Sequence, residues 1–151
     1  MGSHLFVNTR FEERAGQFSP DGRWVVYTSD ETGTKEVYVR PFPMSSGGKW
    51  PVSNGGGSQP RWRRDGKELF YFAPDSTLMA VPVTAGSTFQ LGVPKALFRT
   101  TVLGGTGGGP GSSWRYDVSP DGQRFLINTA LEEVTSSPIT VVVNWQTTLK
   151  K

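Results

Sequence analysis

The chain has 151 residues with 19 glycines and 11 prolines, a composition that favours one domain of short strands and turns over a helical one. It has no cysteine and its only histidine is His4, which excludes disulfides, thiol nucleophiles, Ser-His catalysis and histidine-rich metal sites. The net charge is +3 but the basic residues are scattered, so we expect no nucleic-acid partner. No apolar run reaches the roughly 18 residues that would span a membrane.

The first nine residues precede the main pattern. Residues 1–4 are typical of an expression-vector remnant. Residues 5–9 are a short apolar run, and we expect them to form an outer strand that completes a neighbouring part of the fold.

Residues 10–57 form the first of three similar units. Its predicted strands cover 15–19, 23–29, 35–40 and 49–53. Ser19-Pro20-Asp21-Gly22 predicts a hairpin turn, because proline fixes φ for a type I turn and glycine supplies the positive φ that the chain needs next. The strand Trp24-Val25-Val26-Tyr27 is apolar at every position, so we expect it to be covered on both faces.

Residues 58–103 form the second unit. Its predicted strands cover 59–63, 67–72 and 78–83, with one outer strand somewhere in 89–98. The turn Arg63-Arg64-Asp65-Gly66 loses the proline but keeps Asp-Gly. The strand Leu69-Phe70-Tyr71-Phe72 after it is again apolar on both faces.

Residues 104–151 form the third unit, with predicted strands at 114–119, 123–128 and 139–145 and no fourth strand. The glycine-rich stretch at 104–113 is interpreted as a flexible loop, since it lacks the Lys-Ser/Thr and the helix of a phosphate-binding loop. Asp121-Gly122 forms the turn, and Leu126 in the following strand is expected to be buried, as is Val26 in the first unit.

The three units are copies of one repeat. Asp21, Asp65 and Asp121 are 44 and 56 residues apart, and the loop at 104–113 accounts for the longer interval. This period is the size of one four-stranded blade of a β-propeller, in which neighbouring blades cover both faces of each sheet. The sequence therefore predicts an all-β propeller fold with three four-stranded blades.

Three blades are too few to close a ring, because propellers typically have about 4 to 8. The third unit lacks an outer strand, whereas residues 5–9 are expected to form an outer strand that belongs to none of the three units. A homodimer in which residues 5–9 complete the third blade of the partner would give a closed six-bladed ring. We therefore expect a half-propeller that dimerises by strand exchange.

The repeat resembles the TolB-type, WD40-like propeller repeat, whose signature is matched best by 18–27 and 118–127. Residues 47–53, 62–71 and 137–145 resemble the C-terminal propeller of bacterial serine/threonine protein kinases. This resemblance implies a sensor or interaction module from the periplasmic or extracytoplasmic part of a larger bacterial protein. No kinase catalytic motif is present in the chain, so the resemblance implies no kinase activity.

The candidate ligand-binding residues lie near the entries of the inner strands, where a propeller channel opens. They are Arg14, Gln59, Arg61 and Arg115. Such a cationic funnel suits a carboxylate, a phosphate or an acidic peptide. The alternative is that these residues form salt bridges between blades, with Asp65 or Asp117 as partners.

The acidic residues predict no metal site and no cofactor. Asp30-Glu31 and Glu132-Glu133 lie in expected hairpin loops without the ligand spacing of a calcium loop, and the three Asp-Gly carboxylates are interpreted as turn formers. The function expected from the sequence is therefore a non-catalytic binding module. A metal-dependent hydrolytic propeller enzyme and a purely structural oligomerisation scaffold are the alternatives.

Overall fold

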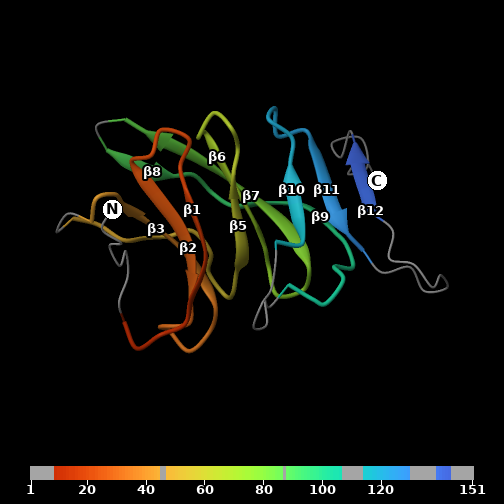
Figure 1. The fold of residues 1–151 in the computed structure, drawn as a ribbon, viewed down its shortest axis with the longest axis horizontal. Coiled ribbons are helices and arrows are strands. Elements are labelled where there is room, and N and C mark those ends of the chain that lie inside the picture. Colours follow the sequence, from red (N-terminus) through yellow and green to blue (C-terminus); the bar gives the residue numbers. More distant parts are fainter. Residues whose placement is uncertain (1–8, 45–46, 87, 107–113, 130–138, 144–151) are drawn as a thin grey trace, which may run out of the picture.

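A computed structural model describes residues 9–44, 47–86, 88–106, 114–129 and 139–143. These residues form three antiparallel sheets and no helix, which confirms the all-β class (Figure 1). Among them, accordingly, no helix could cross a membrane. The strands are β1 (Glu13–Phe18), β2 (Trp24–Ser29), β3 (Glu36–Pro41), β4 (Trp50–Pro51), β5 (Ser58–Trp62), β6 (Glu68–Phe72), β7 (Thr77–Ala85), β8 (Phe89–Leu91), β9 (Lys95–Arg99), β10 (Tyr116–Val118), β11 (Arg124–Asn128) and β12 (Ile139–Val143).

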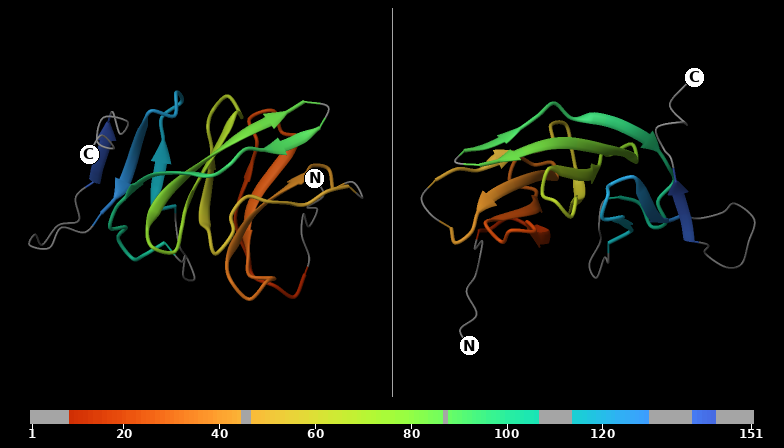
Figure 2. Two further views of the ribbon diagram at one scale, coloured as in Figure 1. Left: turned by 180° about the vertical axis from the view of Figure 1, so that it is seen from behind. Right: turned by 90° about the horizontal axis from the view of Figure 1, so that it is seen from above.

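Each sheet keeps the order of the chain. The first sheet is β1-β2-β3-β4, the second begins β5-β6-β7, and the third is β10-β11-β12. Figures 1 and 2 show the second sheet standing between the other two. The strand expected at 5–9 lies outside the described residues, except for Thr9, which belongs to no strand. Residues 144 and 145 of the strand expected at 139–145 also lie outside them.

The outer edge of the second sheet differs from the prediction. Two short strands replace the single expected one, and both pair with the nine-residue β7: β8 with its end and β9 with its beginning. Pro94 lies between them and has no N–H to donate to a ladder, and the Gly92 N–H donates to the Pro82 carbonyl at 2.8 Å. The interruption therefore has a local cause that the outer-strand prediction overlooked.

The Asp-Gly turns are confirmed. Their three glycines have φ of 70°, 72° and 72°, and each glycine N–H donates to the carbonyl of the residue three positions earlier at 2.8 to 2.9 Å. Each aspartate carboxylate accepts the N–H of the residue two positions later at 3.0 to 3.1 Å. The turn is thus held by its own aspartate, which explains why the middle copy tolerates the loss of proline.

Strand β6 contributes to two cores, one on each face. Leu69 and Tyr71 pack with the first sheet, whereas Phe70 and Phe72 pack with the third. The ring centroids of Phe70 and Phe125 lie 5.0 Å apart in an edge-to-face arrangement, a favoured geometry for aromatic pairs. The prediction that this strand is covered on both faces is confirmed, and the covering layers are neighbouring sheets.

The expectation that Leu126 is buried was wrong. Val26, Phe70 and Leu126 occupy the same position of the repeat, yet their exposed fractions are 0%, 1% and 44%. The first two side chains are covered by the next sheet along the chain, but no further sheet follows the third one among the described residues. Leu126 therefore lies on an end face of the stack.

Candidate functional site

The inner strands β1 and β5 carry three of the four predicted site residues on matching local geometry, and Arg115 comes directly before β10. The register is irregular between Arg14 and Gln17 in β1 and between Ser58 and Arg61 in β5. Ala15 and Gln59, which are 44 residues apart, both have a φ of 53°. Such bulges redirect the side chains around them. The two inner strands therefore share a bulge at the same repeat position, which sets the direction of the side chains around it.

Gln59 is buried and ties the second sheet to the third. Its side-chain oxygen accepts the Arg115 backbone N–H at 2.8 Å, and its amide nitrogen donates to the Thr106 carbonyl at 3.3 Å. The Ser58 hydroxyl donates to the same carbonyl at 2.5 Å. Gln59 and Arg115 are thus in direct contact, and both ends of the Gln59 amide take part in this junction.

Arg61 also reaches the third sheet. Its guanidinium carbon lies 4.6 Å from the centroid of the Trp114 ring, and its Nη2 donates to the Tyr116 carbonyl at 3.4 Å. Its Nε lies 3.9 Å from a carboxylate oxygen of Asp117, the partner that the salt-bridge alternative named. The equivalent residue of the first unit, Gln17, accepts the Trp62 N–H at 3.1 Å. Tying one sheet to the next is therefore a repeated role of this position.

Arg14 and Arg115 have different surroundings. Arg14 belongs to the first sheet and pairs with Glu12, and this hydrogen bond lowers the pKa of the Glu12 carboxyl. The Arg115 Nη2 lies 3.0 Å from the position that a Cβ would take at Gly104, so an alanine there would displace the guanidinium. The structure brings Gln59, Arg61 and Arg115 together at one junction and leaves Arg14 in another sheet. Ligand binding by these residues stays a prediction.

The acidic residues at 30 and 31 have local partners. Asp30 accepts the Glu12 N–H at 2.9 Å, and Glu31 pairs with Lys49. Glu132 and Glu133 lie outside the described residues, as does the loop from 107 to 113. Within the described ranges, no three His, Cys, Asp or Glu side chains gather as a metal site would require.

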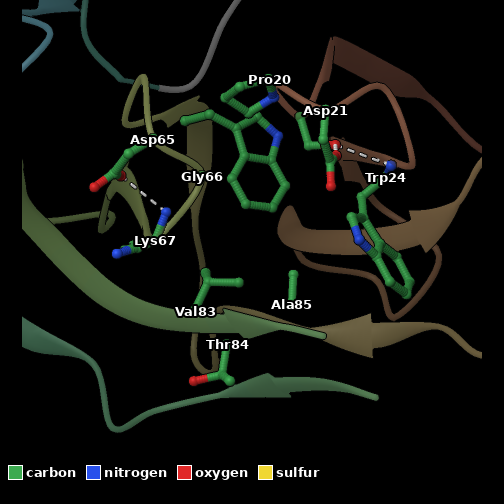
Figure 3. Close-up of a pocket in the computed structure, with 11 residues that line it drawn as sticks. Pro20, Asp21, Trp24, Asp65, Gly66, Lys67, Val83, Thr84 and Ala85 are labelled. Carbon is green, nitrogen blue, oxygen red and sulfur yellow. Dashed lines mark hydrogen bonds between the residues drawn. The ribbon is translucent and has the colours of Figure 1, made fainter. Parts of the chain in front are cut away.

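A crevice between the first two sheets was not found from the sequence. It has a volume of about 520 Å³ and lies where the first Asp-Gly turn faces the second. Figure 3 shows Asp21 and Trp24 on one side, Asp65 and Lys67 on the other, and the end of β7 below them. Its lining residues are Ser19, Pro20, Asp21, Trp24, Trp62, Asp65, Gly66, Lys67, Val83, Thr84 and Ala85.

Both aspartates of the crevice are ionised at neutral pH. The Ser19 hydroxyl, with help from Arg23, lowers the pKa of Asp21 to about 2, and the Arg63 guanidinium lowers the pKa of Asp65. The crevice thus combines two carboxylates and the Lys67 ammonium with two indole rings. A comparison of the repeat copies could have picked out its turn residues as equivalent positions, but not the fact that the two turns face each other.

The Asp21 pKa makes stability depend on pH. Because its folded value of about 2 lies below the usual 3.8, the stabilisation is complete above about pH 5 and is lost as pH falls through 2. We expect the thermal midpoint of the wild type to fall between pH 5 and pH 2 by more than that of Asp21→Asn, measured by circular dichroism. Equal losses would show that Asp21 contributes nothing to acid sensitivity.

Comparison with known proteins gives the fold. No family model and no curated protein sequence matches the chain. TolB from Acinetobacter baumannii matches with a TM-score of 0.56 and 18% identity over 88% of this chain and 30% of TolB. A protein of Bacteroides uniformis assigned as a 6-phosphogluconolactonase matches with a TM-score of 0.50 and 14% identity over 91% of this chain and 42% of its own. An oligogalacturonate lyase from Vibrio parahaemolyticus has a TM-score of 0.46 at 13% identity.

The likeness to TolB confirms the fold of a partial β-propeller. The chain spans 30% of the length of TolB and 42% of that of the lactonase-type protein. At these identities the likeness concerns fold alone, because propellers host many unrelated functions.

Proposed function

We propose that the chain is a non-catalytic interaction module, a set of propeller blades whose third sheet associates with further blades supplied by a second copy. The observation that carries this proposal is the Leu126 face. The same repeat position is fully covered at the two internal junctions, by sheets of this chain, and is 44% exposed at the third. Apolar faces of this kind favour association.

The solution mass of the protein, measured by light scattering on a sizing column, tests this proposal. We expect twice 16.5 kDa for the wild type. Leu126→Asp should shift the mass toward the monomer, because an aspartate would place a charge within the new interface. Val93→Asp is the matched control, since Val93 is 77% exposed and lies in the second sheet's outer loop. A wild-type monomer would contradict the proposal.

Strand exchange is the finer part of this proposal. In it, residues 5–9 pair with the third sheet of the partner, and this segment lies outside the described residues apart from Thr9. Deletion of residues 1–9 should abolish the dimer or strongly weaken it. A dimer of unchanged stability after the deletion would contradict strand exchange but leave face-to-face association standing.

The ligand side of the module is proposed at the junction of Gln59, Arg61 and Arg115, with an acidic peptide as ligand. The observation that favours it is that Arg61 and Arg115 meet at this junction, and Arg115 has no carboxylate partner among the described residues. We expect Arg115→Gln to weaken the binding of a glutamate-rich peptide at least fivefold in a calorimetric titration. Arg64→Gln, at an exposed turn position, should leave it unchanged. Equal affinities of the two variants would contradict this assignment.

The chain is further proposed to belong to a larger bacterial sensor or regulatory protein. The support is the resemblance of residues 47–53, 62–71 and 137–145 to kinase-linked propellers, together with the fraction of TolB that the chain spans.

A further inference from the structure

The junction of the second and third sheets corresponds to the junction of the first and second sheets, where the crevice lies. Its wall in the first sheet is formed by Ser19, Asp21 and Trp24, besides Pro20. With the repeat spacing of 44 residues, these three correspond to Arg63, Asp65 and Glu68 of the second unit. The two junctions can therefore be compared residue by residue.

The corresponding three residues of the second unit form an ion cluster, here called the Arg63 cluster (Arg63, Asp65 and Glu68). The Arg63 Nε and Nη2 donate to the two Asp65 carboxylate oxygens at 2.7 and 2.9 Å. Its Nη1 donates to Glu68 at 3.0 Å. Such two-point pairing is the strongest geometry between arginine and a carboxylate.

Arg63 also occupies the space beside the next turn. Its Cδ lies 2.6 Å from the position that a Cβ would take at Gly122, and the Phe70 ring lies 3.4 Å from that position. The aliphatic part of Arg63 is thus packed against the turn of the third sheet. The second junction is closed by an arginine side chain that belongs to the protein itself.

The first junction has a serine where that arginine would stand. The Ser19 hydroxyl donates to Asp21 at 2.6 Å and accepts the Trp24 N–H at 3.0 Å, so it remains within its own turn. Trp24 replaces the carboxylate of Glu68 with an indole face. Because serine is too short to reach the neighbouring turn, the crevice of about 520 Å³ stays open.

The open crevice keeps what an arginine side chain needs. Asp21 is ionised, and among the described residues its Oδ2 accepts one donor, the Arg23 Nε at 2.7 Å. The Arg23 side chain of this ion pair is 58% exposed. Trp24 lines the crevice with an indole that also contacts Phe89 and Trp50, and an indole attracts a guanidinium. Lys67 adds a positive charge at the opposite wall, but its side chain is exposed and Asp65 lies beside it.

We propose that this crevice binds an arginine side chain of a separate polypeptide, in the place that Arg63 fills at the next junction. The incoming guanidinium pairs with Asp21 and lies against Trp24, and its aliphatic part packs between the two turns. The volume falls within the range of about 300–1,000 Å³ that ligand sites occupy. This site is distinct from the two sites of the proposed function, which are the end face at Leu126 and the junction of Gln59, Arg61 and Arg115.

The first test is a titration with the capped peptide acetyl-Gly-Arg-Gly-amide, followed by the NMR signals of the Trp indoles and the Gly66 amide. We expect saturable shifts at Trp24, Trp62 and Gly66. The peptide with citrulline in place of arginine has the same shape without the charge, and it should bind at least tenfold more weakly. An absence of shifts at these residues, or equal affinity for the two peptides, would overturn the proposal.

The second test fills the crevice from within. Ser19→Arg should weaken peptide binding at least tenfold, because the new side chain occupies the position of Arg63. Ser119→Arg is the matched control: Ser119 has the same hydrogen bonds in the third turn but lies away from the crevice, so its variant should bind as the wild type does. Wild-type affinity in a folded Ser19→Arg variant would overturn the proposal.

These outcomes are separable from those of the assembly. Ser19 lies at the first junction and not on the Leu126 face, so Ser19→Arg should keep the wild-type mass in solution. If the wild type is a monomer but binds the arginine peptide, the dimer proposal is contradicted and the crevice proposal stands.

Discussion

Replacing Val26 with aspartate is expected to unfold the protein. Val26 has no exposed surface and belongs to the core between the first and second sheets, with Val39 opposite it in the ladder of β2 and β3. An unpaired carboxylate in such a core costs several kcal/mol, a large part of the roughly 5–15 kcal/mol that stabilise a typical domain. Circular dichroism should show the loss of the cooperative thermal transition.

Leu126→Asp is the matched control for this variant, because the two residues occupy the same repeat position. At 44% exposure the Leu126 side chain already contacts water, so the variant should keep a cooperative transition even where it loses the dimer. A folded Val26→Asp protein, or loss of the fold in both variants, would contradict the assignment of buried and open junctions.

Truncating Phe70 to alanine is expected to cost about 3–5 kcal/mol, the usual loss for a buried phenylalanine. Phe70 is 1% exposed, packs edge-to-face on Phe125 and contributes to the core between the second and third sheets. The loss should appear as a lower free energy of unfolding in urea titrations. The signals of the third sheet should respond first, because this core joins that sheet to the second.

Phe18→Ala provides the comparison. Phe18 is 54% exposed and has an aromatic neighbour of its own, Phe42, at a centroid distance of 4.9 Å. The change should therefore cost less than about 1.5 kcal/mol, the upper end of what an aromatic pair contributes beyond buried area. Similar losses for Phe70→Ala and Phe18→Ala would mean that the junction of the second and third sheets does not carry the stability assigned to it.

The crevice between the first and second sheets could not be predicted from the repeat alone. The sequence places Ser19 and Arg63 at the same repeat position, but serine before an Asp-Gly turn is an ordinary turn residue and arginine an ordinary surface one. The contact of Arg63 with the turn at Gly122 shows that the position faces the next sheet. Once this contact is known, the shorter Ser19 side chain explains why the first junction stays open.

The inner-strand arginines illustrate the same limit. The chain positions of the four predicted site residues indicated a shared location, but only Gln59, Arg61 and Arg115 meet at one junction, whereas Arg14 lies in the first sheet. Their partners are largely backbone carbonyls and amides of the next sheet, which have no signature in the sequence. The ties between sheets therefore depend on atoms that composition and spacing do not describe, and ligand binding at this junction stays a prediction.

The sequence by itself determined the local structure: the three hairpin turns, the strands that follow them and the three-sheet repeat. Asp-Gly turns and runs of apolar residues act over a few positions, so their physics is already contained in neighbouring residues. The tertiary structure decided which faces are covered. It buried Val26 and Phe70 and left Leu126 exposed, although all three are apolar residues of equivalent strands. Burial depends on whether another sheet stands on that face, and a strand's own residues cannot encode its neighbour.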